Sequence, residues 1–312
     1  MKDLFNREID YLRVSVTQRC NLNCIYCGKS DCGKKQQELS LDEIARLVRA
    51  FAACGIRKVR VTGGEPLVRQ DVVQIVERIA AIPGIETVGL TTNGVLLEQY
   101  AAPLAKAGLQ SVNISLDSTD GSTYRHLTGA DVLDRVLRGI AAAQDAGLSP
   151  IKLNAVLMKG VNADGASALV ELARTRTIDV RFIELMPFAD AGDTDALRVT
   201  GDELLQQFPF LQLLPTQETG TAVYYGAPGF RGRVGLISPV SHQFCDRCSR
   251  VRLLADGTVK PCLAYDTVYD LKPYLPDEAA LAAAVRDIIL KKPAGHAFQS
   301  APPQHGLNRT GG

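Results

Sequence analysis

Residues 20–27 read Cys20-Asn-Leu-Asn-Cys24-Ile-Tyr-Cys27 and follow closely on the apolar run Leu12–Val16. Clustered thiolates are soft ligands that select iron–sulfur clusters, zinc or copper(I). A cubane 4Fe–4S cluster has four irons, so three cysteines leave one iron open to a small molecule. A structural zinc site normally closes its shell with four protein ligands at a different spacing. The spacing of these cysteines therefore favours an open 4Fe–4S cluster over zinc.

Composition and charge are those of an ordinary globular chain. Its 312 residues are 46% apolar and 22% charged, with 35 Lys and Arg against 34 Asp and Glu. This predicts a full core, in one large domain with an appendage or in two domains. The balanced charge gives no reason to expect nucleic acid or a membrane as partner, and no apolar run approaches the ~20 residues that span a bilayer. Because no signal peptide is visible, we expect a cytoplasmic protein whose cysteines are ligands or free thiols.

Apolar runs and helical periodicities alternate along residues 1–209. Six strands are predicted, over residues 12–16, 58–62, 86–92, 111–116, 151–158 and 180–185. Helices are predicted over residues 40–55, 71–81, 97–107, 131–146, 165–174 and 201–208. The first helix opens with the capping box Ser40-Leu-Asp-Glu43. Such alternation predicts a parallel sheet, either doubly wound or a partial barrel.

Polar residues and glycines follow the predicted strands. They are Cys20, Gly63-Gly64-Glu65, Thr91-Thr92-Asn93, Ser115-Leu-Asp117, Asn154 and Met186-Pro187. Any one of them alone is more simply a turn, because turns favour Gly, Asn, Asp and Ser. The carboxyl ends of parallel strands are nevertheless where such folds build their sites. Six such ends around one cluster motif favour a partial barrel with its site at the mouth.

The alternation of helix and strand is lost beyond residue 210, so residues 210–312 are predicted to form a smaller C-terminal domain. Short strands are predicted at 222–225 and 232–237, and a helix at 278–291. A second cysteine group lies here, as Cys245-Asp-Arg-Cys248 and, fourteen residues on, Cys262. We interpret it as a second open 4Fe–4S cluster. His242 lies nearby, so a zinc site remains an alternative.

Three arginines accompany this second group: Arg247, Arg250 and Arg252. On an extended segment the last two point the same way. Guanidinium groups suit phosphate, to which they donate charge-assisted hydrogen bonds. A solvated basic face is the simpler alternative for three arginines taken alone.

The first cysteine spacing, with Tyr26 before the last cysteine, resembles the radical S-adenosylmethionine superfamily. The spacing C-x2-C-x13-C with Arg-x-Arg after its second cysteine, Gly-Gly-Glu-Pro at 63–66 and the final Gly311-Gly312 resemble the GTP 3′,8-cyclase family. The resemblance runs from about Arg13 to Cys262. It implies an α/β fold: an incomplete (βα)6 TIM-like barrel over residues 1–209, and a smaller domain over 210–312 that carries a second iron–sulfur cluster.

The resemblance also implies an activity, the lyase reaction that opens molybdenum cofactor biosynthesis. S-Adenosylmethionine on the first cluster is cleaved reductively to a 5′-deoxyadenosyl radical, which takes hydrogen from C3′ of GTP. C3′ then bonds to C8, giving (8S)-3′,8-cyclo-7,8-dihydroguanosine 5′-triphosphate. The implied cofactors are two 4Fe–4S clusters and S-adenosylmethionine. The implied partners are GTP, a reductant such as flavodoxin or ferredoxin, the downstream cyclic pyranopterin monophosphate synthase, and a second copy in a homodimer.

Residue roles follow from the same resemblance. The implied iron ligands are Cys20, Cys24, Cys27, Cys245, Cys248 and Cys262. The implied S-adenosylmethionine contacts are Tyr26, Gly64, Ser115 and Met186. The implied GTP contacts are Arg13, Arg60, Thr91, Lys152, Arg181, Arg250 and Arg252. The implied catalytic residues are Arg13, Lys152, Gly311 and Gly312. Cys32 and Cys54 match no ligand position, and we interpret them as a loop thiol and a helix-packing thiol.

Two other functions stay open. One is a radical S-adenosylmethionine enzyme that modifies a peptide and uses an auxiliary cluster. Such enzymes commonly carry seven or more C-terminal cysteines, whereas three lie beyond residue 240 here. The other is a non-catalytic iron–sulfur or zinc binding protein. A metal count distinguishes these, since about eight irons per chain fit two clusters and two zinc ions do not.

Overall fold

The computed structural model describes residues 1–27, 38–188, 194–215, 220–296, 298 and 302–304. Gly311 and Gly312, with their predicted catalytic roles, and Cys32, the predicted loop thiol, lie outside these residues.

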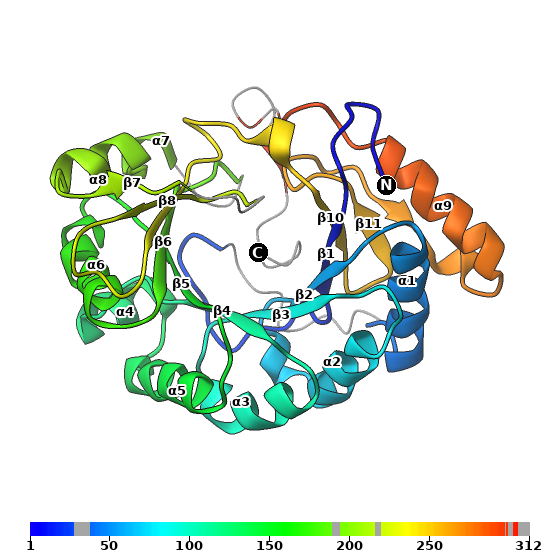
Figure 1. The fold of residues 1–312 in the computed structure, drawn as a ribbon, viewed down its shortest axis with the longest axis horizontal. Coiled ribbons are helices and arrows are strands. Elements are labelled where there is room, and N and C mark those ends of the chain that lie inside the picture. The colour runs from blue at the N-terminus through cyan, green and yellow to red at the C-terminus, as the bar shows by residue number, and fades with distance from the viewer. Residues whose placement is uncertain (28–37, 189–193, 216–219, 297, 299–301, 305–312) are drawn as a thin grey trace.

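One sheet organises the described chain, with strands in the order β12-β11-β10-β1-β2-β3-β4-β5-β6-β9-β8-β7 (Figure 1). The strands are β1 (Tyr11–Ser15), β2 (Lys58–Thr62), β3 (Thr87–Thr92), β4 (Ser111–Ser115), β5 (Ile151–Val156), β6 (Asp179–Ile183), β7 (Gln212–Leu213), β8 (Val223–Gly226), β9 (Val234–Ile237), β10 (Arg250–Leu253), β11 (Thr258–Lys260) and β12 (Tyr269–Asp270). The helices are α1 (Leu41–Ala53), α2 (Val72–Ala80), α3 (Leu97–Lys106), α4 (Gly121–Thr128), α5 (Leu133–Asp145), α6 (Ala166–Thr175), α7 (Thr194–Leu197), α8 (Gly201–Gln207) and α9 (Glu278–Leu290).

The strands β1 to β6 confirm the predicted parallel sheet. Each pairs in parallel with the next one along the chain. A doubly wound sheet needs a reversal of strand order, and this order has none, so that alternative is wrong. Figure 1 shows the six strands curving around a central space, with α1, α2, α3, α5 and α6 on the outside.

Along each strand, side chains alternate between the hydrophobic core, which lies against the helices, and the inner face of the curved sheet. On β1, Leu12 and Val14 are fully buried and belong to the hydrophobic core. Tyr11 and Arg13 point the other way and line a cavity. Successive side chains of a strand face opposite sides, so this inner face can be polar while the outer face packs on helices.

Two strands from the C-terminal part extend this parallel sheet at both ends, which the sequence did not predict. β10 pairs in parallel with β1, so that Arg252 lies beside Arg13. β9 pairs in parallel with β6, so that Gly235 lies beside Arg181. The arginines near the second cysteine group therefore share the inner face with those of the first strands.

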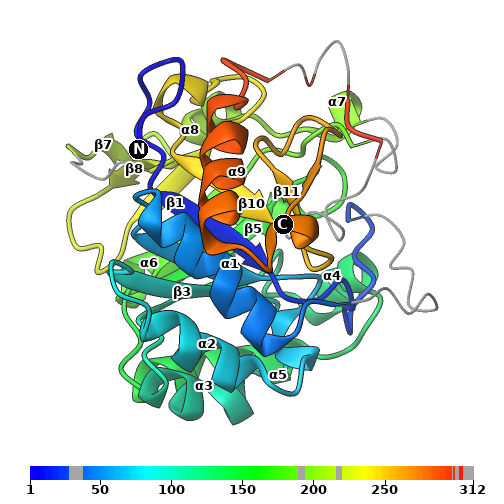
Figure 2. The same cartoon turned by 90° about the vertical axis from the view of Figure 1, so that its right-hand side faces the viewer.

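The predicted helices are present, with α9 packed beside α1 (Figure 2). Cys54 caps α1, is 5% exposed, and lies 3.6 Å from the carbonyl oxygen of Ala282 in α9. Its predicted role as a packing thiol is confirmed. Helix α4 was missed, because its sequence Gly121–Thr128 is polar and short, and helix α7 was also missed.

The capping box of α1 offers a test of local stability. The backbone N–H of Glu43 donates to Ser40 Oγ at 3.3 Å, and that of Ser40 donates to the Glu43 carboxylate at 2.7 Å. Ser40→Ala should lower the free energy of unfolding by about 1 kcal/mol. Ser40→Thr, which keeps the acceptor, should change it little. Chemical denaturation measures both, and an alanine variant as stable as the wild type would show that the box contributes nothing.

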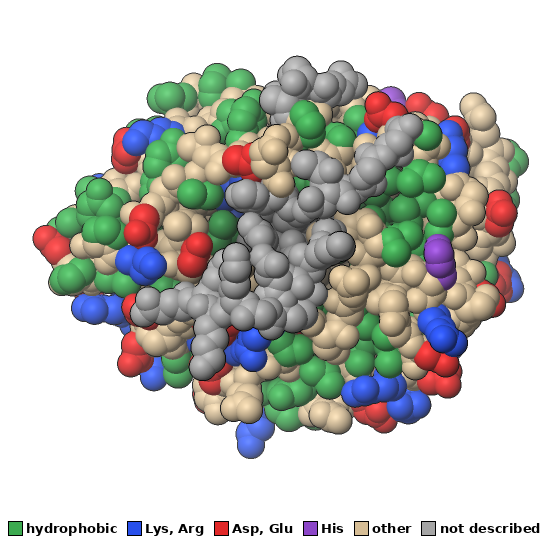
Figure 3. Space-filling view, turned by 180° about the vertical axis from the view of Figure 1, so that it is seen from behind, with side chains coloured by type: hydrophobic (Ala, Val, Ile, Leu, Met, Phe, Trp, Pro, Cys, Tyr) green, Lys and Arg blue, Asp and Glu red, His purple; other side chains and the backbone are tan. Residues whose placement is uncertain are grey.

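The outer surface carries no single dominant sign of charge on the face shown in Figure 3, where acidic and basic side chains are interspersed around the periphery. Across the described ranges, the helices are all too short or too polar to cross a bilayer.

Candidate active site

A cavity of about 580 Å³ lies on the inner face of the sheet. It is lined by every predicted cysteine ligand and by every residue predicted to contact S-adenosylmethionine or GTP. The remaining predicted site residues, Gly311 and Gly312, lie outside the described residues. Cys20 and Cys262, which are 242 positions apart in the sequence, thus face the same space.

The first cysteine group, Cys20, Cys24 and Cys27, follows β1 at the carboxyl edge of the sheet. All three are free and only partly exposed. Burial raises the pKa of Cys20 and of Cys24, and for Cys24 the nearby Asp117 carboxylate and the two other thiols raise it further. Buried thiolates next to one another need cations to offset their charge. Three soft donors that converge in this setting fit the irons of a cluster.

The second cysteine group, Cys245, Cys248 and Cys262, lies beside buried cations. Lys292 is 4% exposed and donates to the carbonyl oxygens of Arg250 and Pro261, each at 2.8 Å. Burial alone would raise the pKa of Cys248, but the charges of Arg250 and Lys292 lower it to about 6. This cysteine is therefore held as the thiolate, which is the form that binds metal.

Arg7 fixes the backbone around the second group. Its guanidinium donates to the carbonyl oxygens of Cys245 and Ala294 at 2.9 Å and of Pro293 at 2.7 Å, and it pairs with Asp3. The loop with the first cysteine of the group is thus tied to the segment after α9. With the backbone fixed in this way, the three cysteine thiols of the second group fit a cluster that has one open iron.

His242 does not support the zinc alternative. Its side chain is 63% exposed and its Nε2 lies 3.0 Å from Asp202 Oδ2. In the part of the chain that the structure describes, no group of three His, Cys, Asp or Glu side chains is arranged to hold a single metal ion.

The turn after β2 packs directly on the loop before the first cysteine group. The N–H of Gly64 donates to Thr17 O and that of Glu65 to Arg19 O, both at 2.8 Å. The buried Glu65 carboxylate accepts from Leu67 N, Thr92 Oγ1 and Asn93 N at 2.9, 2.7 and 2.6 Å. Burial raises its pKa to about 7, although these hydrogen bonds oppose the rise. Glu65 thereby joins the ends of β2 and β3 behind the cysteines.

Gly64 has no room for a side chain. An added Cβ would lie 2.5 Å from Arg19 O and 2.7 Å from Gln18 O, which are backbone atoms. Gly64→Ala must therefore move the loop that leads into Cys20. Because overpacking of this kind shifts the backbone, we expect the displaced loop to misplace the first cysteine group and to lower the affinity for S-adenosylmethionine about tenfold or more.

Equilibrium dialysis of the anaerobic protein measures this loss. Gly121→Ala is the matched control, since a Cβ there meets nothing within 4 Å. Equal affinity in the Gly64→Ala and control variants would show that the close packing of Gly64 on the backbone of residues 18 and 19 does not affect binding of S-adenosylmethionine.

Tyr26 is fixed by a buried carboxylate. Its hydroxyl donates to Asp117 Oδ2 at 2.6 Å, and Asp117 Oδ1 accepts from Val156 N at 2.8 Å. Burial raises the pKa of Asp117 to about 6, although these two bonds oppose the rise. The ring of Tyr26 is thus held at the cavity near the first cysteine group, with Asp117 just beyond the end of β4.

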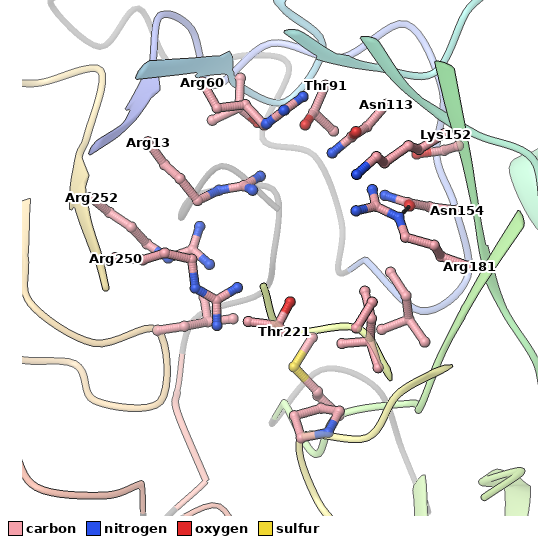
Figure 4. Close-up of a pocket in the computed structure, with 18 of the residues that line it drawn as sticks. Arg13, Arg60, Thr91, Asn113, Lys152, Asn154, Arg181, Thr221, Arg250 and Arg252 are labelled. Carbon is pink, nitrogen blue, oxygen red and sulfur yellow. Dashed lines mark hydrogen bonds between the residues drawn. The ribbon is translucent and has the colours of Figure 1, made fainter. Parts of the chain in front are cut away.

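The cavity also has a cationic lining, which consists of Arg13, Arg60, Lys152, Arg181, Arg250 and Arg252. Figure 4 shows these side chains converging from β1, β2, β5, β6 and β10 on one space. Burial and the charges of Arg60 and Arg250 lower the pKa of Arg13 to about 10, against the opposing effect of Tyr11. Burial and the charges of Arg13 and Arg250 also lower the pKa of Arg252. A polyanion would stabilise such a cluster.

Two neutral polar groups point to a ligand as well. Thr91 Oγ1 and Asn113 Oδ1 are buried and have no hydrogen-bond partner among the described residues. They lie side by side, because Thr91 of β3 and Asn113 of β4 are in register. Buried polar atoms are normally paired, so orphaned atoms in a cavity lining are where a bound molecule is expected.

Several lining residues were not predicted from the sequence: Tyr11, Lys58, Asn113, Thr221, Tyr224, Lys292 and His296. Tyr11 and Lys58 could have been found, since each lies two positions before a predicted arginine on the same strand face. Tyr224 and Lys292 come from segments whose place in the fold the local pattern does not show.

Comparison with known proteins agrees with this site. The chain matches the Radical SAM superfamily over residues 14–173 and Molybdenum Cofactor Synthesis C over residues 178–298. The GTP 3′,8-cyclase of Alkaliphilus oremlandii is 42% identical over 301 residues, covering 95% of this chain and 94% of the relative. GTP 3′,8-cyclase 1 of Pseudomonas aeruginosa is 44% identical over 306 residues, covering 95% and 93%.

A solved structure shares the fold. Streptococcus suis SuiB bound to S-adenosylmethionine matches with a TM-score of 0.65 at 15% identity, covering 97% of this chain and 77% of that chain. The fold and the first cysteine group define a radical S-adenosylmethionine protein, which implies a 4Fe–4S cluster and S-adenosylmethionine. Within that class, the chain belongs to the GTP 3′,8-cyclase family.

Proposed function

We propose that this protein is a radical S-adenosylmethionine enzyme that converts GTP to (8S)-3′,8-cyclo-7,8-dihydroguanosine 5′-triphosphate in molybdenum cofactor biosynthesis. One observation carries the proposal: two groups of three cysteines and nine Lys and Arg side chains line a single cavity. The first group fits a cluster that holds S-adenosylmethionine, the second fits a cluster that takes a purine, and the cations fit a triphosphate.

We propose further that strands β1 to β6 with their helices form an incomplete (βα)6 TIM-like barrel over residues 1–209. A smaller domain over residues 210–312 would then carry the second 4Fe–4S cluster. The boundary is supported by α8, which ends the alternation, and by β7 and β8, which begin antiparallel pairing. By adding β9 and β10 to the two ends of the parallel strands, the second domain completes the cavity.

The residues around the first cysteine group position S-adenosylmethionine. Cys20, Cys24 and Cys27 hold the first cluster, whose chemistry when bound is an electron transfer that cleaves S-adenosylmethionine to a 5′-deoxyadenosyl radical. The glycine at position 64 lets the backbone approach the methionine end. Tyr26, held by Asp117, together with Ser115 and Met186, contacts the adenosine end.

The cationic lining orients GTP. Arginine and lysine side chains bind the triphosphate by charge-assisted hydrogen bonds, and Thr91 adds a hydroxyl. Cys245, Cys248 and Cys262 hold the second cluster near the purine. Fixing both ends of GTP in this way would orient its ribose for the reaction. We keep the family's catalytic role for Arg13, Lys152, Gly311 and Gly312.

A nucleotide suits this cavity better than a peptide. The fold itself does not decide, because SuiB bound to the precursor peptide SuiA has a TM-score of 0.65 with this chain. A concentration of buried arginine and lysine needs a compact polyanion, which a triphosphate supplies and an ordinary peptide does not.

The same family membership supports the partners. We propose that flavodoxin or ferredoxin supplies the electron, that cyclic pyranopterin monophosphate synthase takes the product, and that the chain can form a homodimer. We also propose a cytoplasmic location for these reactions.

The decisive experiment is anaerobic incubation of the reconstituted protein with S-adenosylmethionine, a reductant and GTP, followed by mass analysis. We expect 5′-deoxyadenosine and a product with the mass of GTP. Parallel incubations with ATP and with GDP test whether the reaction requires the guanine base and the triphosphate. Release of 5′-deoxyadenosine with no change in GTP would refute GTP as the substrate. A metal analysis that finds about two zinc ions per chain and no iron would refute the proposed enzymatic function.

A further inference from the structure

Arg60 of the cationic lining is held by three residues that the family comparison does not assign. Its Nε donates to the Tyr11 hydroxyl at 2.5 Å, its Nη1 to Leu90 O at 2.9 Å and its Nη2 to Ser111 Oγ at 3.4 Å. A guanidinium has five N–H bonds, one on Nε and two on each terminal nitrogen. Within the described parts of the chain, one N–H on each terminal nitrogen thus remains for a ligand.

The side chain of Arg60 reaches across a neighbouring strand to make these contacts. Arg60 of β2, Gly89 of β3 and Ser111 of β4 stand in register with one another. A Cβ at Gly89 would lie 2.7 Å from Arg60 Nη2, 2.8 Å from its Cζ and 2.8 Å from Ser111 Oγ. The guanidinium therefore lies over Gly89, in space that only glycine leaves open. Figure 4 shows it reaching toward Thr91, the next inward-facing residue of β3.

Tyr11 is surrounded by cations. On its own strand the next inward residue is Arg13, and its neighbours in register are Lys58 on one side and Arg250 on the other. Burial alone would raise the pKa of Tyr11, but Arg60 and Arg13 lower it to about 8. Its oxygen is thus an acceptor polarised by several positive charges, which favours a strong hydrogen bond from Arg60.

We propose that Tyr11, Gly89 and Ser111, which we term the Arg60 support, orient the guanidinium of Arg60 as a two-pronged donor to the phosphate tail of the substrate. These are positioning residues that act through Arg60. The inference deepens the proposed function and rests on it for the identity of the substrate. Its chemistry requires only a phosphate chain, to which the two remaining N–H bonds can donate in parallel.

Preorganisation explains why such a support matters. A long arginine side chain in solution samples many rotamers, and holding it before the ligand arrives removes that entropic cost from binding. Arg13, the partner of Arg60 in register, carries the same charge, so the support also holds Arg60 in place against this repulsion.

The test uses the anaerobically reconstituted full chain and two probes, GTP and inorganic triphosphate, in equilibrium dialysis. Tyr11→Phe removes one oxygen and should lower the affinity for both probes about tenfold, while the affinity for guanosine stays unchanged. In turnover, KM for GTP should rise and kcat should stay nearly constant. Gly89→Ala should weaken binding as much as Arg60→Ala does, because its Cβ displaces the guanidinium. Tyr225→Phe is the control, since Tyr225 packs against the core away from the cavity.

The double variant Tyr11→Phe/Arg60→Ala distinguishes positioning from a general structural role. If Tyr11 acts through Arg60, the double variant binds both probes as weakly as Arg60→Ala alone. A further tenfold loss in the double variant, or equal triphosphate binding by wild type and Tyr11→Phe, overturns the inference. Wild-type protein that binds triphosphate in a Tyr11-dependent way but does not bind GTP supports the Arg60 support and refutes the proposed substrate. Wild-type protein that binds neither probe overturns both.

Discussion

Replacing Cys24 with serine is expected to abolish cleavage of S-adenosylmethionine and formation of the cyclised nucleotide together. Cys24 is the middle cysteine of the first cysteine group, which we propose holds the first cluster, and a serine hydroxyl is a harder and far less acidic donor than a thiol. The cluster at this group should not assemble, so the iron content should fall from about eight to about four per chain. Iron and sulfide analysis, with 5′-deoxyadenosine release, measures both effects.

Cys54→Ser is the matched control for this change. Cys54 is more deeply buried than Cys24 and packs α1 against α9, away from the cavity. The Cys54→Ser variant should keep all of its iron and show full activity, with a small loss of folding stability. If Cys24→Ser keeps all its iron, or if Cys54→Ser loses half of it, the first cysteine group is not the cluster site.

The sequence was a good guide wherever a local pattern carried the information. Alternation of apolar runs and helical periods gave all six strands β1 to β6, because one face of each must pack on helices. The spacing of Cys20, Cys24 and Cys27 pointed to their shared function, because the ligands are adjacent in the chain. The capping box at Ser40 located the start of α1 to the residue.

Long-range pairing was beyond the reach of such patterns. Arg252 and Arg13 are 239 positions apart, and nothing local in either strand indicates that β10 pairs with β1. Strand register is set by the packing of the whole sheet. The contact of Tyr11 with Arg60, and the space over Gly89, depend on that register and so appear only in the structure. Helix α4 was missed for a different reason, since its sequence is polar and its stability comes from burying Tyr124 and Leu127.

Arg252→Ala is expected to lose the GTP-dependent product while S-adenosylmethionine cleavage survives. Arg252 is 6% exposed, lies on β10 between Arg13 and Lys260, and falls between Cys248 and Cys262 of the second cysteine group in the sequence. Its removal takes away a buried charge that the triphosphate would meet, so we expect GTP affinity to fall about 100-fold. The first cysteine group is untouched, so 5′-deoxyadenosine should still form without cyclised nucleotide.

The stability of the same variants shows whether Arg252 serves the ligand or the fold. Burial and the charges of Arg13 and Arg250 lower the pKa of Arg252, so its positive charge opposes folding. Arg252→Met, which keeps most of the volume without the charge, should therefore unfold at the same or a higher temperature although it no longer binds GTP. Arg252→Lys should recover part of the binding, because it restores the charge and not the planar pair of donors. A methionine variant that unfolds at a lower temperature would place Arg252 with the scaffold. One that also loses S-adenosylmethionine cleavage would place it with the first cysteine group. In either case Arg252 would no longer belong to the cationic lining.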